Sequence, residues 1–321
     1  MKIYELGERE VLERVIFPLL DKNINELNID EDAVAIKLDD DHFLVINTDT
    51  FVKKTDAPAL MEYRQMGIRV VTMSVSDLFA KGALPKGFLL AASVPAYLDL
   101  DSFREIMLGI KDACKKYNMS FLGGDLGGAD DVVLTGIAFG FSERIIRRDS
   151  ARPGDTVWVT GDFGVSGAAL HYMLNKGKAE EQIISGILDK YFNPQISPSD
   201  AKGLIRCASA AMDSSDGLAI TLHTLARKSK VKIVLDKIPL NSVVIEYAKL
   251  NKADPIKFAL YGGEEFEIVF TVRNMNDNEV IKIFKKHGAR KPIKIGKIEK
   301  GEGVFYGGKR IEERGWQHFT K

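Results

Sequence analysis

Apolar residues recur along the chain in two patterns, a helical period and short apolar runs typical of strands. The places where one pattern replaces the other mark the ends of the expected helices and strands. The helical period predicts a first helix over 6–19, bent near its end by Pro18, and a long helix over 61–80 that Gly82 closes. A further helix is expected over 101–117, with Asp99 or Asp101 as its N-cap. Short apolar runs predict strands in the first half at 33–38, 43–47, 88–94 and 132–141. The first half therefore mixes strands and helices.

The second half begins after a turn signal and alternates more regularly. Arg152-Pro153-Gly154-Asp155 is such a signal, and a strand follows it at once, so we expect domains at 1–150 and 151–321. Strands are expected at 156–160, 231–235, 267–272 and 293–298, and a hairpin at 303–311. Helices are expected at 164–176, 180–192, 199–209, 217–229, 242–250 and 277–287. The fold class is α/β, with an α+β N-terminal domain and an α/β C-terminal domain.

Composition narrows the class of protein. The 321 residues carry 45 Lys plus Arg and 45 Asp plus Glu, so charge favours neither a nucleic acid nor an anionic membrane as partner. Cys114 and Cys207 lack metal-ligand spacing and fit reduced core thiols. The chain has no signal-peptide pattern and no apolar run of membrane-spanning length. We expect a soluble, cytoplasmic protein.

Six short acidic clusters stand at the edges of apolar segments. They are Asp30-Glu31-Asp32, Thr48-Asp49-Thr50, Ser76-Asp77, Gly123-Gly124-Asp125, Asp213-Ser214-Ser215-Asp216-Gly217 and Gly262-Gly263-Glu264-Glu265. Magnesium takes oxygen ligands and commonly shares them with substrate phosphates. The five His residues show no ligand spacing. The pattern therefore favours magnesium-nucleotide chemistry over zinc chemistry.

Each cluster also has a purely structural interpretation. Asp49 follows an apolar strand and Asp77 lies inside an apolar helix, where an unpaired charge is costly; a buried cap or a solvated turn is the alternative. Asp216 could be the N-cap of the next helix, but that leaves Asp213 unexplained. The glycines before Asp125 suit a phosphate-binding loop or an ordinary turn. Glu264 lies in a loop that is either exposed or functional.

Several other motifs match known signatures only in fragments. Val34-Ala35-Ile36-Lys37 and Asp162-Phe163-Gly164 match protein-kinase motifs, but no glycine-rich loop precedes the first and no His-Arg-Asp loop lies between them. Gly161, Gly164 and Gly167 have dinucleotide-fingerprint spacing without the acidic residue that should follow. Arg148 lies in a cluster of arginines that forms either a solvated face or a clamp for phosphate.

Taken together and in order, the motifs resemble the thiamine-monophosphate kinase family, whose fold is PurM-like, as in aminoimidazole-ribonucleotide synthetase. The resemblance runs from residue 5 to residue 319. It is carried by Glu5-Leu6-Gly7-Glu8, Asp49-Thr50, Ser74-Val75-Ser76-Asp77-Leu78, Gly123-Gly124-Asp125, Ala151-Arg152-Pro153-Gly154-Asp155, Met212-Asp213-Ser214-Ser215-Asp216-Gly217-Leu218, Gly262-Gly263-Glu264 and Gly315-Trp316-Gln317-His318-Phe319.

The resemblance implies a homodimer that pairs through the N-terminal sheet, with a C-terminal domain closing the site. It implies in-line phosphoryl transfer from ATP to thiamine monophosphate, giving thiamine diphosphate, with several Mg²⁺ ions and no general base. The implied metal ligands are Asp32, Thr48, Asp49, Asp77, Asp125, Asp213 and Asp216. The implied ATP contacts are Gly124, Asp125, Arg148 and Ser215. Glu264 and Trp316 are implied to contact the acceptor, as is Asp56, which stands where many members carry His.

Two alternatives to this function remain open. Glu265 replaces a common Asp and Asp56 stands where many members carry His, so another ATP-dependent PurM-like enzyme acting on a different small substrate remains open. Glu31 replaces one of a usual pair of aspartates, and its longer side chain argues against a metal-ligand role at that position. Selenophosphate synthetase normally needs a Cys near its N-terminus, and no Cys precedes Cys114. The other alternative is a nucleotide-binding homodimer without turnover, against which the retained acidic set argues.

Overall fold

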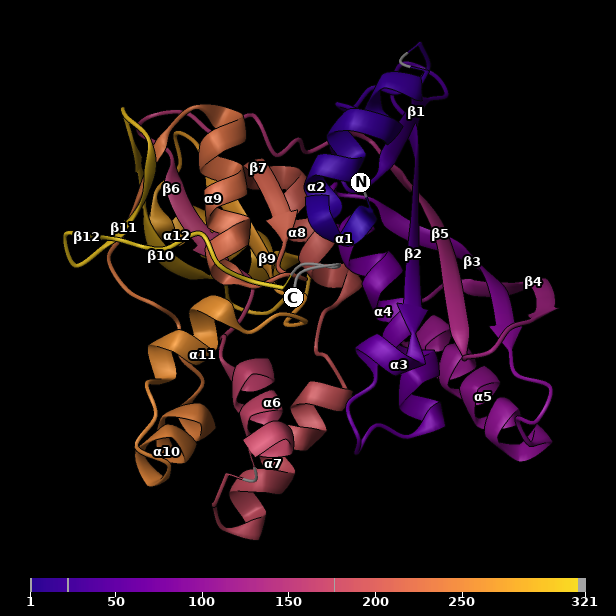
Figure 1. Ribbon diagram of the computed structural model, residues 1–321. Coiled ribbons are helices and arrows are strands. Elements are labelled where there is room, and N and C mark those ends of the chain that lie inside the picture. Colours follow the sequence, from indigo (N-terminus) through magenta and orange to yellow (C-terminus); the bar gives the residue numbers. More distant parts are fainter. Residues whose placement is uncertain (1, 22, 176, 317–321) are drawn as a thin grey trace.

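The computed structural model describes residues 2–21, 23–175 and 177–316. Figure 1 shows two bodies, each built on one sheet: a five-stranded sheet with its helices on the right, and a seven-stranded sheet with its helices on the left. The short helices that start the chain lie between the two bodies. This arrangement leaves the junction of the sheets as the place where distant segments meet.

The first sheet has the order β1-β2-β5-β3-β4, and only β3 and β4 run parallel. Its strands are β1 (Val34–Lys37), β2 (Phe43–Val52), β3 (Leu84–Val94), β4 (Ser120–Gly128) and β5 (Val133–Ser142). Helices α4 (Tyr63–Ala80) and α5 (Leu100–Lys116) accompany this sheet, with the short α3 (Lys53–Asp56) after β2. Asp99 is the N-cap of α5, because its carboxylate accepts a hydrogen bond from Ser102 N at 2.8 Å.

The two long helices approach each other closely at glycines. A Cβ on Gly67 would lie 2.1 Å from the carbonyl oxygen of Ile106, and one on Gly109 would lie 2.0 Å from that of Arg64. Only glycine fits at both positions. The contact holds α4 in place with thirteen of its residues buried, and Asp77 is one of these. A rigid α4 therefore carries this carboxylate to the junction of the two bodies.

The second sheet has the order β12-β11-β8-β10-β6-β9-β7 and is antiparallel except where β8 meets β11. Its strands are β6 (Thr156–Val159), β7 (Ala208–Asp213), β8 (Lys232–Leu235), β9 (Ile268–Val272), β10 (Ile293–Glu299), β11 (Gly303–Tyr306) and β12 (Lys309–Arg310). The helices are α6 (Val165–Asn175), α7 (Glu181–Phe192), α8 (Pro198–Cys207), α9 (Leu218–Ser229), α10 (Ser242–Leu250), α11 (Pro255–Tyr261) and α12 (Asp277–Lys286). The α/β class with two unlike bodies is confirmed.

The local structure differs from the sequence-based interpretations in four places. The first helix is instead broken into α1 (Ile3–Leu6), α2 (Glu8–Val11), a π-helical turn (Leu12–Ile16) and a 3₁₀ turn (Phe17–Leu19). Strand β2 continues past Asn47, so Asp49 lies within the strand and does not follow it. Gly123-Gly124-Asp125 belongs to β4 and is not a turn. Gly217, and not Asp216, is the N-cap of α9.

The buried apolar residues form two clusters. The larger one joins α4, α5 and the first sheet to α7, α8 and α12, and it includes Val75, Phe88 and Phe284. The smaller one fills the space between α9 and the second sheet. Because the larger cluster contains residues of both bodies, their mutual orientation is set by packing. None of the described helices combines the length and apolarity that crossing a bilayer requires.

Candidate active site

Three carboxylates that are distant in the sequence converge between the two sheets. Asp32 precedes β1, Asp77 lies near the end of α4, and Asp213 ends β7. One carboxylate oxygen from each lies within 4.8 Å of the other two. Asp77 and Asp213 are 7% and 2% exposed, while Asp32 is half-buried. We call Asp32, Asp77 and Asp213 the acidic cluster.

Asp49 and Asp216 lie beside the acidic cluster. In the first sheet Asp49 is in register with Gly136, which is in register with the buried Leu90, so the Asp49 side chain lies on the face that α4 covers. Burial, with the charges of Asp213 and Asp32, raises the pKa of Asp49 to about 7. Burial and the charge of Asp213 likewise raise the pKa of Asp216 to about 7.

The acidic cluster holds more negative charge than its surroundings balance. Burial, followed by the charges of neighbouring aspartates, raises the pKa of Asp77 well above its ordinary value. Burial, followed by the charge of Asp32, raises the pKa of Asp213 to about 6. Carboxylates crowded in this way titrate together, and a bound cation relieves their repulsion.

Hydrogen bonds orient the acidic cluster and leave some oxygen atoms unused. Asn47 Nδ2 donates to Asp77 Oδ2 and to the carbonyl of Asp32, each at 2.7 Å, and Ser76 Oγ donates to Asp213 Oδ2 at 2.7 Å. Among the described residues, two buried oxygen atoms here lack any partner: Asn47 Oδ1 and Ser214 Oγ. Unpaired buried oxygen atoms beside crowded carboxylates fit a hard divalent cation.

A buried ionic group lies behind the acidic cluster. Glu31 is fully buried and pairs with both Lys81, also fully buried, and Arg148, whose Nε lies 2.9 Å from Glu31 Oε2. Although burial opposes its ionisation, the charges of Lys81 and Arg148 hold the pKa of Glu31 below its ordinary value. Arg148 Nη2 also forms an ion pair with Asp32 Oδ2, at 2.6 Å. Arg148 therefore connects Glu31 to the acidic cluster.

The loop that contains Glu264 joins the segment after β7. Glu264 N donates to the carbonyl of Ser215 at 2.5 Å, and Phe266 N donates to that of Ser214 at 3.0 Å. Trp316 N donates to the carbonyl of Asp216 at 3.0 Å, and the side chain of Trp316 is 51% exposed. Three of the predicted residues, Ser215, Glu264 and Trp316, thus lie next to Asp216.

The Glu264 loop has an unusual backbone. Glu264 and Phe266 have φ of +63° and +57°, a conformation that non-glycine residues adopt at some cost. Glu265 between them fixes the loop, because its Oε1 accepts hydrogen bonds from Gly164 N at 2.7 Å and Ser166 N at 3.0 Å at the start of α6. Burial raises the pKa of Glu265 to about 8.

Four predicted site residues lie away from the acidic cluster. Thr48 and Asp125 are exposed on the open face of the first sheet, since Asp125 is in register with Ala91, Thr135 and Thr50. Gly124 lies in β4, where a Cβ would come within 1.8 Å of the carbonyl oxygen of Leu90. Asp56 accepts a hydrogen bond from Val52 N at 2.7 Å. Gln317, His318 and Phe319, part of the family resemblance, lie outside the described residues.

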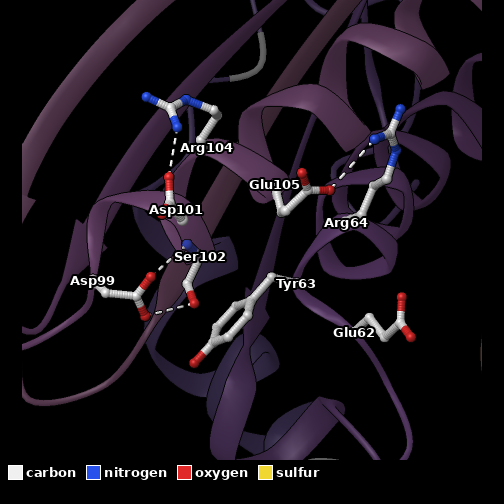
Figure 2. Close-up of a pocket in the computed structure, with 8 residues that line it drawn as sticks. All are labelled: Glu62, Tyr63, Arg64, Asp99, Asp101, Ser102, Arg104 and Glu105. Atoms are coloured by element: carbon white, nitrogen blue, oxygen red, sulfur yellow. Dashed lines mark hydrogen bonds and ion pairs between the residues drawn. The ribbon is translucent and has the colours of Figure 1, made fainter.

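A surface pocket of about 410 Å³ at the starts of α4 and α5 is separate from this site. Most of its charged side chains are paired: Figure 2 shows Arg64 with Glu105, Arg104 with Asp101, and Asp99 with Ser102. Arg64 also pairs with Asp112, outside the pocket lining. Tyr63, also in its lining, lies about 21 Å along α4 from Asp77 at the helical rise per residue. The pocket is therefore remote from the acidic cluster.

Sequence reasoning missed three residues that this site uses. Asn47 ends the strand expected over 43–47, and a polar residue at a buried strand position near Asp49 is the signal that could identify it. Lys81 and Arg69 are completely buried, yet in a helical pattern they are indistinguishable from solvent-facing cations. Their partners, Glu31 and Glu264, are far away in the sequence. Only the tertiary structure supplies that pairing.

Comparison with known proteins agrees with the fold. The model of the N-terminal domain of AIR synthase related proteins matches residues 30–142, and that of the C-terminal domain matches residues 152–308. The chain is 38% identical over 294 residues to thiamine-monophosphate kinase of Pyrococcus horikoshii, covering 90% of each chain. It is 30% identical over 323 residues to that of Aquifex aeolicus, covering 99% of this chain and 100% of the relative.

A solved structure gives the same result. AaThiL complexed with AMPPCP and TMP superimposes with a TM-score of 0.88 at 29% identity, covering 99% of both chains. The fold and the domain matches define an AIR synthase related, PurM-like protein. Within that class, the chain belongs to the thiamine-monophosphate kinase family.

Proposed function

We propose that this protein phosphorylates thiamine monophosphate with ATP, giving thiamine diphosphate and ADP. The observation that carries the proposal is the convergence of Asp32, Asp77 and Asp213, beside a loop that holds Glu264. Family membership supports the same reaction, since the relatives above are named for it and one was solved with AMPPCP and TMP. The γ-phosphoryl group leaves ADP as the bond to the acceptor phosphate forms, by in-line transfer.

The chemistry demands little of a general base. The attacking phosphate oxygen is already ionised near neutral pH, so the obstacle is the repulsion between two polyanions. Bound Mg²⁺ ions supply positive charge between them and orient the phosphates. Asp32, Asp77 and Asp213 fit as ligands, with Asp49 and Asp216 beside them, and the unpaired oxygen atoms of Asn47 and Ser214 are further donors.

We assign different residues of the site to the nucleotide and to the acceptor. Arg148 and Ser215 are proposed to contact ATP, as are Gly124 and Asp125, although β4 lies away from the acidic cluster. Glu264 and Trp316 are proposed to contact the acceptor, because an exposed indole and a carboxylate suit a cationic heteroaromatic ring. Thr48 and Asp56 stay proposals that no contact in the described residues supports.

We further propose that the protein is a homodimer that pairs through its first sheet. The face that bears Thr48 also bears apolar side chains that stay partly exposed, such as Leu84, Leu122 and Phe141 at 38%, 56% and 40%. Such a face suits association with a second copy. Domains at 1–150 and 151–321 and a cytoplasmic location, suggested by the two buried free cysteines, complete the proposal.

A turnover assay tests the reaction. The protein is incubated with ATP, Mg²⁺ and thiamine monophosphate, with thiamine as the control acceptor, and products are measured by mass spectrometry. We expect thiamine diphosphate and ADP in equal amounts, from the monophosphate alone. ATP binding without turnover of either acceptor would contradict the proposed acceptor and leave the fold assignment intact.

A further inference from the structure

Arg69 is a completely buried cation that reaches from α4 into the second body. Its Nη1 lies 3.0 Å from Glu264 Oε2, and its Nη2 donates a hydrogen bond of 2.7 Å to the carbonyl of Tyr191. The guanidinium lies 4.6 Å from the centre of the Tyr191 ring and 5.5 Å from that of Phe266. Both rings belong to the second body, so Arg69 has its partners across the junction.

Glu264 compensates the buried positive charge of Arg69. A guanidinium stays protonated in proteins, and a buried charge without a partner is strongly unfavourable. Within the described residues, Glu264 is the single carboxylate in ion-pair contact with Arg69. Arg69 Nε and Nη1 have no hydrogen-bond partner there, so no other acceptor substitutes for this carboxylate. Arg69 therefore needs Glu264 as its ion-pair partner.

Glu264, in contrast, uses only one of its two carboxylate oxygen atoms in these contacts. Its Oε2 receives the hydroxyl of Tyr191 at 2.6 Å as well as the contact with Arg69. Its Oε1 makes no hydrogen bond to any described residue, and the side chain is 26% exposed. The protein thus holds one oxygen of this carboxylate, while the other is available to a ligand. The loop also has a positive φ at residue 264, which is an unfavourable backbone conformation for a non-glycine residue.

The helix that carries Arg69 also carries Asp77 of the acidic cluster. The two residues are about 12 Å apart along the axis of α4, given the rise of an α-helix. Because α4 is buried and packed against α5 at two glycines, this separation is rigid. A single rigid element therefore fixes the distance from the reacting centre to the Glu264 carboxylate.

We propose that Arg69 is a positioning residue for the acceptor substrate: it holds Glu264 Oε2 so that Oε1 faces the polar or cationic end of the acceptor while the phosphate end lies at the acidic cluster. This inference rests on the proposed function and deepens it. It defines the acceptor class as an elongated phosphate monoester with a hydrogen-bond donor or positive charge at its far end. Arg69 itself does not touch the acceptor.

The test compares kinetic constants in a double-substitution set: R69M, E264Q and R69M/E264Q. Met keeps the length and apolar stem of Arg without its charge. We expect R69M to raise KM for thiamine monophosphate about tenfold, the loss expected for a charge-assisted contact, with KM for ATP nearly unchanged. E264Q should do the same, and the double substitution should be no worse than E264Q alone, since Arg69 acts through Glu264. R69K should recover part of the loss.

T72V is the matched control. Thr72 lies one turn further along α4, is buried, and shares a hydrogen bond with Tyr117 of the first body at 2.9 Å. We expect T72V to leave the ratio of the two KM values unchanged. If R69M leaves KM for the acceptor as in the wild type, or alters kcat and both KM values as T72V does, Arg69 is structural and the inference is wrong. If the wild type itself fails to convert thiamine monophosphate, the proposed function fails first, and this inference with it.

Discussion

Glu31 accepts hydrogen bonds from both the backbone N and the side-chain Nε of Arg148, each at 2.9 Å. Because Glu31 also pairs with the buried Lys81, one carboxylate stabilises two buried cations. Glu31 stands where the family usually has an aspartate, and its oxygen atoms are already occupied, so it is unsuited to be a metal ligand. It instead fixes Arg148, which in turn lies against Asp32 of the acidic cluster.

Replacing Glu31 with Gln should therefore destabilise the protein strongly. Lys81 would keep its burial and lose its charged partner, which costs about 3–5 kcal/mol for a buried pair. Urea unfolding measures this loss. E143Q is the control, since Glu143 pairs with Arg206 on the surface, with both side chains more than half exposed, and should change the stability by about 0.5 kcal/mol or less. Equal effects of the two substitutions would contradict the role of Glu31.

Asp213→Asn should abolish turnover while leaving the fold intact. The substitution removes one charge from the crowded cluster and one ligand oxygen, so we expect kcat to fall about a hundredfold or more. Thermal unfolding without metal should show no loss of stability, whereas the stabilisation by added Mg²⁺ should shrink. Asp112, an exposed residue that pairs with Arg64, provides the control D112N. Wild-type rates in D213N at matched Mg²⁺ would remove the metal role from Asp213.

The metal-free protein should lose stability as pH rises. In the folded state Asp49 and Asp216 have their pKa raised from 3.8 to about 7, and that of Asp213 is raised to about 6. Between the ordinary pKa of 3.8 and these raised values, the folded state binds protons that the unfolded chain has already released. The free energy of unfolding therefore decreases as pH rises across this window. Stabilisation by Mg²⁺ should change oppositely and be larger at pH 8 than at pH 5.

Thermal unfolding in the presence and absence of Mg²⁺, at several pH values, measures both trends. D213N should flatten the metal-free trend, because it removes one of the titrating groups and the charge that raises the pKa of Asp49 and Asp216. A metal-free melting temperature that rises from pH 5 to pH 8 in the wild type would show that the acidic cluster does not control stability.

The sequence predicted most of the acidic cluster and less of what surrounds it. Asp77 and Asp213 could be predicted because a carboxylate next to buried apolar residues needs a partner. Strand β4 could not be predicted, because apolar and polar residues do not alternate along this exposed edge strand and its glycines resemble those of a turn. Gly124 shows the reason: its missing Cβ allows β4 to approach Leu90.

Long-range pairing explains the remaining differences. The ion pairs of Arg69 with Glu264 and of Lys81 with Glu31 join residues that no local pattern connects. The end of a strand is similarly ambiguous: β2 continues through Thr48-Asp49-Thr50 because β5 pairs with it along its whole length. Asp49 and Thr48 thereby point to opposite faces of the sheet, which separates two residues that the sequence assigned to the same metal set.

A charge on the open face of the first sheet should dissociate the proposed homodimer. Leu122 lies on β4 and is 56% exposed. It is next to Gly87 of β3, since a Cβ built on Gly87 would lie 2.7 Å from Leu122 Cδ1. We expect L122E to shift the protein from dimer to monomer in analytical ultracentrifugation, because a carboxylate in an apolar contact must be desolvated. L174E on α6 is the control, since Leu174 is 76% exposed on the other body. A wild-type protein that sediments as a monomer, or an L122E variant that remains dimeric, would exclude this sheet as the interface.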